Sequence, residues 1–160
     1  MADAPFRAAV IAISTSKAAG EGEDESGPKL KALLESAGCE VVSLELIPDN
    51  RELIAGRIRF YSDEDACDLV ATTGGTGLSP DDVTPEATRD VIDREAPGIA
   101  EAMRLESRQH VPKHWMLSRG VAGSRGTTLI VNFPGNPNAI EQAGAAITPS
   151  LGHALGLLRR

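Results

Sequence analysis

Three glycines within four residues precede two aspartates in the segment TTGGTGLSPDDVTP, residues 72–85. Glycine has no Cβ atom, so its backbone N–H groups can approach a phosphate closely, and the hydroxyls of Thr73 and Thr76 add further donors. A carboxylate beside a phosphate is repelled unless a cation such as Mg²⁺ lies between them. The glycines and Asp82 together therefore favour a site for a metal-bound nucleotide or phosphate.

The same residues also have simpler interpretations. The segment lacks the Gly-Lys-Ser/Thr ending of a Walker loop and the third glycine of the dinucleotide fingerprint, and a GGTG sequence can merely turn the chain. Asp82 could cap the helix that Thr84 and Pro85 predict, and Asp49 could cap a helix at 50–62. The residues alone leave capping and ligand binding open for both aspartates.

The surrounding segments alternate between strand and helix patterns, which indicates an α/β fold with a mostly parallel sheet covered on both faces. The strands are predicted at 7–14, 40–48, 67–73, 115–120 and 127–133. The helices are predicted at 27–38, at 49–64, from Thr84-Pro85 onward, at about 97–110, and after 134–138 to the C-terminus with an interruption at Pro149. The short link between the last two strands predicts a hairpin, so one strand of that pair should be antiparallel.

Four loops follow the predicted strands, and they hold most of the unusual residues. These loops span 14–27, 47–50, 73–85 and 134–138. Ligands of open α/β sheets bind beyond the carboxyl ends of the strands, so the four loops predict one composite site. The acidic stretch EGEDE at 21–25 is expected to be a solvated part of the first loop, because adjacent like charges resist packing.

Composition excludes several classes of function. The chain of 160 residues has 16 Lys and Arg against 23 Asp and Glu, with one Trp, one Tyr and three Phe, so nucleic acid is not an expected partner. No apolar run is long enough for a membrane span, and no signal peptide is evident. Cys39 and Cys67 have no metal or redox spacing and are expected to be buried and inert. We expect a single domain, residues 1–160, in a reducing cytoplasm.

Residues 72–103 and the segment LSRGVAGSRGTTLIVNFPGNP at 117–137 resemble the molybdopterin-binding family of molybdenum-cofactor biosynthesis. The most similar branches are the bacterial molybdopterin adenylyltransferases and the MoaB-type proteins, and the G domain of gephyrin is also similar. The resemblance covers nearly the whole chain. It implies a three-layer α/β/α fold with a five-stranded, mostly parallel sheet in which one strand is antiparallel, commonly assembled as a homotrimer.

The resemblance also implies an activity and its residues. Molybdopterin adenylyltransferases use Mg-ATP to adenylate the terminal phosphate of molybdopterin and release pyrophosphate. Asp49 and Asp82 match the family's two functional aspartates and would act on Mg²⁺ and the reacting phosphates. Phosphate would be held by Gly74, Gly75, Thr76 and Gly77, and the nucleotide or pterin would be bound by Ser14, Ser26, Gly27, Thr73, Ser118, Pro134, Gly135 and Asn136. Lys17, Arg119 or Arg125, together with Mg²⁺, would offset the acidic net charge.

Two departures from the family pattern affect the expected pocket. The chain has Ser14-Thr15-Ser16 where many relatives have Ser-Asp, and it has asparagine in PGN where relatives often have serine. Two other functions remain open: a MoaB-type carrier that binds molybdopterin without chemistry, and a trimeric scaffold module. The presence of both aspartates favours the enzyme, and a molybdenum-insertion protein is an expected partner.

Overall fold

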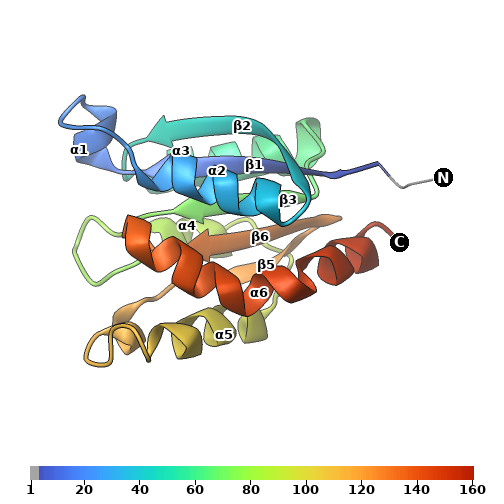
Figure 1. Cartoon of the computed structure of the whole chain (residues 1–160). Helices are drawn as coiled ribbons and strands as arrows, with labels where there is room; N and C mark the ends of the chain where they lie inside the picture. The colour runs from blue at the N-terminus through green and yellow to red at the C-terminus, as the bar shows by residue number, and fades with distance from the viewer. Residues whose placement is uncertain (1–3) are drawn as a thin grey trace.

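The computed structural model describes residues 4–160 and has three layers, with a central sheet between two layers of helices (Figure 1). In chain order the elements are β1 (Phe6–Ile13), α1 (Thr15–Ala18), α2 (Ser26–Ser36), β2 (Cys39–Ile47), α3 (Arg51–Arg59), a π-helical turn η1 (Phe60–Glu64), β3 (Leu69–Thr73), α4 (Thr84–Arg89), β4 (Arg94–Glu95), α5 (Pro97–Ser107), a 3₁₀ turn η2 (Trp115–Leu117), β5 (Ala122–Arg125), β6 (Thr128–Phe133) and α6 (Pro137–Leu158). The predicted α/β/α class is confirmed.

The sheet has the strand order β2-β1-β3-β6-β5-β4. Strands β2, β1, β3 and β6 are parallel, and β5 is antiparallel to both of its neighbours. The predicted single antiparallel strand is therefore confirmed. The carboxyl ends of β1, β2, β3 and β6 meet at one edge of the sheet, where α1 and the loop before α4 project in Figure 1.

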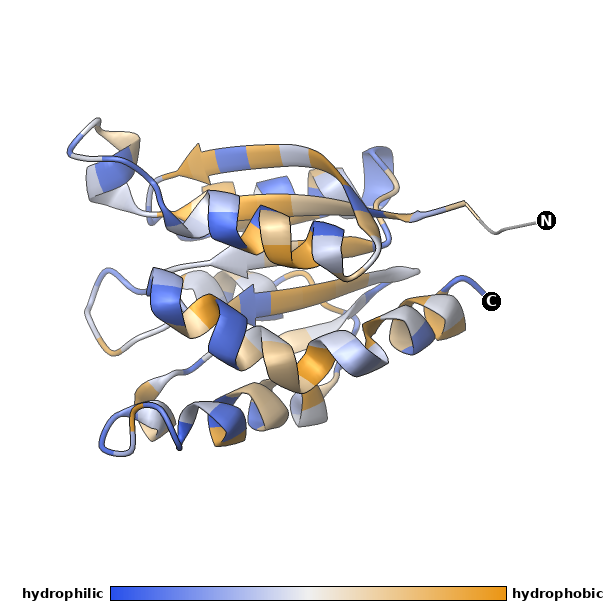
Figure 2. Ribbon diagram, viewed as in Figure 1, coloured by the Kyte–Doolittle hydropathy of each residue, from blue (hydrophilic) through white to orange (hydrophobic). Residues whose placement is uncertain are grey.

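The core lies on both faces of the sheet, because successive side chains of a strand point to opposite faces. Ala8 and Val10 of β1 pack into one apolar cluster, which α2, α5 and α6 cover. Ala9 and Ile11 pack into a second cluster, which α3 and α4 cover. Figure 2 shows the corresponding apolar colour along the central strands and polar colour at the loops. Burial on both faces explains why these strands read as continuous apolar runs.

Two strand predictions are wrong in detail. The sheet has six strands, because Arg94–Glu95 adds a two-residue edge strand whose charged, exposed side chains carry no strand pattern. The strand expected at 115–120 is absent, and Trp115–Leu117 forms a 3₁₀ turn instead. Met116 is 59% exposed, so no sheet face buries this short apolar run. The strand that pairs with β6 begins only at Ala122.

The predicted interruption at Pro149 is also wrong, since α6 runs unbroken through it. A proline inside a helix leaves the carbonyl four residues earlier without its usual donor. That carbonyl belongs to Ala145, and both Ala145 and Pro149 are exposed. Water can therefore satisfy the unpaired carbonyl, and the helix continues through the proline.

The two ends of the described chain meet at the opposite edge of the sheet. The guanidinium of Arg159 donates to the Asp68 carboxylate at 2.9 Å and to the carbonyls of Ala4 and Pro5 at 3.0 and 3.1 Å. In Figure 1 the start of β1 and the end of α6 lie on the side away from α1. Within residues 4–160, no helix has the length and apolar character needed to cross a membrane.

Both cysteines are buried free thiols, as predicted. Burial raises the pKa of Cys39 to about 11 and that of Cys67 to about 12, so almost no thiolate is present near neutral pH. We expect the folded protein to resist labelling by a disulfide reagent at pH 7.5, whereas the denatured protein should release two equivalents of chromophore. Complete labelling of the folded protein within minutes would contradict this expectation.

Candidate functional site

The glycine loop that follows β3 passes directly over the end of β1. Gly74 and Gly75 have positive φ angles of 99° and 69°, which other residues rarely adopt. A Cβ atom on Gly74 would overlap the carbonyl oxygen of Ile13, and one on Gly75 would overlap the hydroxyl of Thr84. These two positions therefore require glycine for both conformation and space.

Asp49 lies at the end of β2 and faces this loop. Its Oδ2 accepts hydrogen bonds from the backbone N–H and the hydroxyl of Thr15, at 3.0 and 2.9 Å. Its Oδ1 accepts no hydrogen bond within residues 4–160 and lies 3.0 Å from the position that a Cβ on Gly75 would occupy. Asn50, not Asp49, caps α3 by accepting from Leu53 N–H. The helix-cap interpretation of Asp49 is therefore wrong.

Asp82 lies against the glycine loop at Gly77 and closes a short turn. Its backbone N–H donates to Ser79 O, and its Oδ2 accepts from Ser79 N–H at 3.1 Å. The same Oδ2 is 2.8 Å from the position of a Cβ on Gly77. No side chain caps α4, and Thr84, the first residue of this helix, donates its hydroxyl to Gly74 O. Asp82 therefore borders the loop without capping the helix, and its Oδ1 has no hydrogen bond from the described residues.

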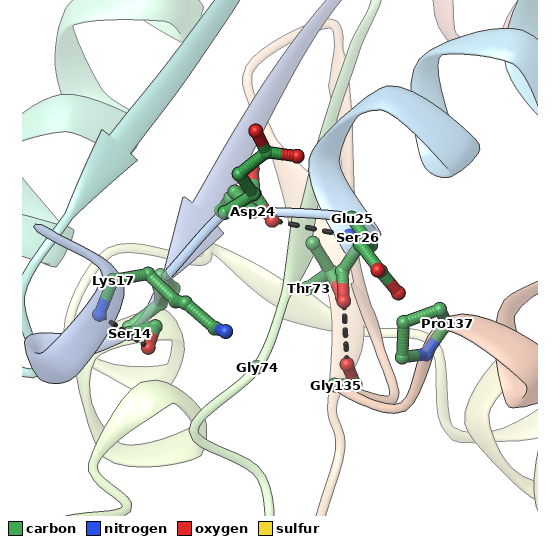
Figure 3. Close-up of a pocket in the computed structure, with 12 residues that line it drawn as sticks. Ser14, Lys17, Asp24, Glu25, Ser26, Thr73, Gly74, Gly135 and Pro137 are labelled. Carbon is green, nitrogen blue, oxygen red and sulfur yellow. Dashed lines mark hydrogen bonds between the residues drawn. The ribbon is translucent and has the colours of Figure 1, made fainter. Parts of the chain in front are cut away.

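A cavity of about 440 Å³ opens beside the glycine loop at the carboxyl ends of β1, β3 and β6 (Figure 3). Its walls contain five of the residues predicted to bind phosphate, nucleotide or pterin, namely Ser14, Ser26, Thr73, Gly74 and Gly135. A second hollow of about 380 Å³ shares Ser14 and is lined by Asp49 and Asp81. The structure thus brings together residues from three of the four predicted loops around the main cavity, and the fourth contributes Asp49 next to it.

Hydrogen bonds between loops hold the cavity wall together. The hydroxyl of Ser26, at the start of α2, donates to Gly135 O at 2.6 Å. The hydroxyl of Thr73 donates to Pro134 O at 2.7 Å. Gly135 also packs on Gly74, because a Cβ on Gly135 would lie 3.1 Å from the Gly74 Cα. The last loop is therefore fastened to both the glycine loop and the start of α2.

Other predicted residues lie outside the wall of the main cavity. Asn136 caps α6, since its Oδ1 accepts from Asn138 N–H at 2.9 Å. Ser118 and Pro134 line a separate small pocket of about 30 Å³ that Trp115 also borders. Gly27 is buried beneath the carboxylate of Asp24, where any larger residue would collide with it.

The three predicted cations have three different environments. Arg125 pairs with Asp63 at 2.8 Å beside the β5–β6 turn, at the amino end of β6, so its predicted role near the ligand is wrong. Arg119 pairs with Glu86 at 2.8 Å. Lys17 lines the cavity, its side chain extends into that space in Figure 3, and no ion pair holds its ammonium group among the described residues.

The acidic stretch in the first loop does more than the sequence predicted. Glu23, Asp24 and Glu25 line the cavity opposite Lys17. Asp24 Oδ1 accepts from the backbone N–H groups of Ser26 and Gly27, at 3.1 and 3.0 Å, and so stabilises the start of α2. An aspartate two residues before a helix start is a recognisable capping signal, and it was available in the sequence.

The carboxylates at the loop fit a magnesium ion that arrives with a nucleotide. Within residues 4–160, no three His, Cys, Asp or Glu side chains are grouped closely enough to hold a metal by themselves. Mg²⁺ instead binds commonly through one or two carboxylates plus substrate phosphates and water. Asp49 and Asp82 each present one carboxylate oxygen without a hydrogen bond, which agrees with that requirement.

The fold is an open α/β sheet, and its main cavity lies at the carboxyl ends of parallel strands, where ligands of such folds bind. Residues 9–153 match the family model described as "Probable molybdopterin binding domain". The chain therefore belongs to this family of molybdenum-cofactor biosynthesis, and the resemblance seen in the sequence is confirmed.

Individual relatives are similar over nearly the whole chain. The chain is 41% identical to the molybdopterin adenylyltransferase of Haemophilus influenzae over 91% of its own length and 75% of that protein. It is 39% identical to the enzyme of the same name from Escherichia coli K12, over 94% and 77% of the two chains. The crystal structure of the molybdopterin biosynthesis enzyme MoaB from Thermus thermophilus superposes with a TM-score of 0.90 at 43% identity, covering 96% of both chains.

Proposed function

We propose that this protein is a molybdopterin adenylyltransferase that uses Mg-ATP to adenylate the terminal phosphate of molybdopterin and releases pyrophosphate. The observation that carries the proposal is the arrangement of Asp49 and Asp82. Each carboxylate lies against the glycine loop with one oxygen that accepts no hydrogen bond from the described residues. Asp49 also lines the hollow next to the main cavity at the strand ends. The names of the two bacterial relatives support the same activity.

In the proposed reaction, a phosphate oxygen of molybdopterin attacks the α-phosphorus of ATP. The bond from the α-phosphorus to the oxygen that bridges to the β-phosphate breaks, and pyrophosphate leaves with that oxygen. The protein contributes position and charge, as in phosphoryl transfer generally, so no covalent enzyme intermediate is required. Mg²⁺ held by Asp49 and Asp82 would neutralise charge on the phosphates. The backbone N–H groups of the glycine loop would orient the polyphosphate, and Lys17 would offset part of its charge.

Several further properties follow from family resemblance and stay part of the proposal. We expect a cytoplasmic homotrimer that passes adenylated molybdopterin to a molybdenum-insertion protein. After the first strand, the Ser-Asp pattern of relatives is replaced by Ser14-Thr15, and Thr15 donates to Asp49. Asp49 therefore supplies a carboxylate beside the end of β1, although the chain has no aspartate directly after Ser14. We expect the proposed metal site to be preserved despite this difference from the relatives.

Replacing Lys17 by glutamine should raise the KM for Mg-ATP about tenfold, because a hydrogen bond to a charged group stabilises by about 1.5–3 kcal/mol. The kcat should change little, since Lys17 is expected to bind the polyphosphate equally in the ground state and the transition state. Lys17→Arg should restore most of the affinity. Lys29→Gln, the same charge change on the exposed side of α2, is the matched control. An unchanged KM in Lys17→Gln would exclude this role for Lys17.

The direct test of the proposed function is a turnover assay with the purified protein, molybdopterin and ATP. In the presence of Mg²⁺, pyrophosphate and adenylated molybdopterin should be formed together. Formation of both products should stop when a chelator is added and resume when Mg²⁺ is restored in excess. Tight binding of molybdopterin without any pyrophosphate release would reject the enzyme and support the carrier. Failure to bind either molybdopterin or ATP would leave the scaffold interpretation.

A further inference from the structure

Four successive carbonyl groups of the glycine loop accept hydrogen bonds from only two residues. The first half of the loop is held by Thr84 at the start of α4. Its hydroxyl donates to Gly74 O at 2.9 Å, and its backbone N–H donates to Gly75 O at 3.1 Å. Thr84 is fully buried, so these bonds are shielded from water. Two hydrogen bonds from the start of α4 therefore hold this part of the loop.

The second half of the loop is held by Arg119, which lies 42 residues away from Gly77 in the sequence. The backbone N–H of Arg119 donates to Thr76 O at 2.8 Å, and its Nε donates to Gly77 O at 2.7 Å. Its Nη2 also donates to Asp82 O at 2.9 Å. One side chain thus links the end of the glycine loop to the aspartate that borders it.

These contacts determine where the backbone donors of the loop point. In a trans peptide the C=O and the following N–H point in opposite directions, and the described chain has no cis peptide. The N–H groups that follow the four anchored carbonyls must therefore point away from Thr84 and Arg119. They belong to Gly75, Thr76, Gly77 and Leu78, and none of them donates to another group within residues 4–160. Successive unpaired N–H groups suit an anionic ligand.

The guanidinium of Arg119 donates four hydrogen bonds to protein groups. Its Nη1 and Nη2 donate to the two carboxylate oxygens of Glu86 at 2.8 and 3.1 Å. With Nε on Gly77 O, every nitrogen of the guanidinium has a protein acceptor. The hydrogen bond from Arg119 lowers the pKa of Glu86, so this carboxylate is ionised at neutral pH and balances the charge of the arginine. Arg119 is therefore poorly placed to bind a phosphate directly.

We propose that Arg119, held by Glu86, is a positioning residue that orients the N–H groups of the glycine loop toward the polyphosphate and fixes the backbone of Asp82 without touching the nucleotide. This inference rests on the proposed function. It replaces the sequence-based expectation that Arg119 attracts the anionic substrate by its charge. Only an arginine can donate simultaneously to Gly77, Asp82 and Glu86, because a lysine has one compact donor group instead of a planar fork.

The two roles of Arg119 give opposite expectations for Glu86→Gln. If Arg119 attracted phosphate by charge, removing the carboxylate would free that charge and tighten anion binding. If Arg119 positions the loop, the change weakens the charge-assisted pair that holds the guanidinium, and anion binding falls. Glutamine keeps the size and an acceptor oxygen, so the fold should survive this substitution.

The experiment measures the binding of inorganic pyrophosphate with Mg²⁺ by calorimetry, and the amide NMR signals of Gly75, Thr76 and Gly77 during the same titration. Arg119→Gln and Arg119→Lys should each weaken binding about tenfold or more, since small misplacements of binding groups are costly. Glu86→Gln should weaken it about threefold to tenfold. Arg89→Gln, an exposed change on the same helix as Glu86, should bind like the wild type. The amide shifts caused by pyrophosphate should shrink in both Arg119 variants.

Tighter binding by Glu86→Gln, or wild-type binding by Arg119→Lys, would overturn the positioning role while leaving the proposed function intact. A wild-type protein that neither binds pyrophosphate nor turns over would reject the proposed function and this inference with it. Thermal unfolding of each variant separates a local change in the loop from loss of the fold. If the Arg119 variants do not fold, the sign of the Glu86→Gln effect decides the question.

Discussion

Asparagine in place of Asp49 or Asp82 is expected to reduce the kcat for pyrophosphate release by about two to three orders of magnitude, the usual effect of removing one group that stabilises transition-state charge. Asparagine matches the size of aspartate and keeps one oxygen, but it removes the charge that would hold Mg²⁺. The remaining oxygen can still accept from Thr15 at position 49 or from Ser79 at position 82. The local fold should therefore be preserved, and the KM for molybdopterin should change little.

The measurement is steady-state pyrophosphate release over a range of Mg²⁺ concentrations, with thermal unfolding of each variant alongside. Activity of the variants should recover partly at high Mg²⁺, because the defect is weaker metal binding. Asp90→Asn is the matched control, since Asp90 lies at the end of α4, is exposed, and its carboxylate pairs with Arg51 without a hydrogen bond to the glycine loop. If both variants turn over within about threefold of the wild type, the loss of rate is too small for residues that hold Mg²⁺, and the metal role is excluded.

Alanine in place of Gly74 is expected to destabilise the protein by about 2–4 kcal/mol, the combined effect of a strained backbone and overpacking. Gly74 has φ of 99°, and an added Cβ would overlap the carbonyl oxygen of Ile13 in the central strand β1. Neither atom can move without shifting the main chain. The midpoint of thermal unfolding should fall by about 5–15 °C for a chain of this size. Turnover should also be lost, because the loop cannot keep its conformation.

Gly56→Ala is the control for this change. Gly56 lies inside α3, and nothing is within 4 Å of the position that its Cβ would take. Alanine there should stabilise the protein by about 0.5–1 kcal/mol, because glycine inside a helix has excess conformational freedom when unfolded. Circular dichroism during heating measures both variants. An unfolding midpoint for Gly74→Ala equal to that of the wild type would show that the loop tolerates a Cβ atom.

The sequence predicted the parts of the fold that depend on local pattern. The apolar runs of β1 and β3 and the glycines at 74 and 75 have local causes, namely burial on both sheet faces and positive φ angles. The ends of parallel strands must meet at one edge, so the grouping of the four loops was also predictable. The conformation of residues 115–120 was not predictable, because their apolar residues lie in a turn on the surface and not in a buried strand.

The missed features of the site depend on contacts between distant residues. No local pattern indicates that Arg119 donates to Thr76 and Gly77, or that Thr84 bonds to the loop instead of capping its own helix. Arg119 and Arg125 are equally basic in the sequence, yet one holds the glycine loop and the other pairs with Asp63 at the opposite end of β6. Which arginine is near the ligand is decided by the path of β5 and β6.

Arg159 brings together the two ends of the described chain, at the sheet edge opposite the cavity. A short linker between the ends would permit circular permutation, with new termini cut into an exposed surface turn such as the one at Gly126. A tag, a tether to a solid support or a fused domain attached at either end would extend away from the strand ends that hold the cavity. Substrates would then reach the glycine loop without passing the attached group. The fold therefore places both ends of the described chain away from the cavity to which we assign the substrates.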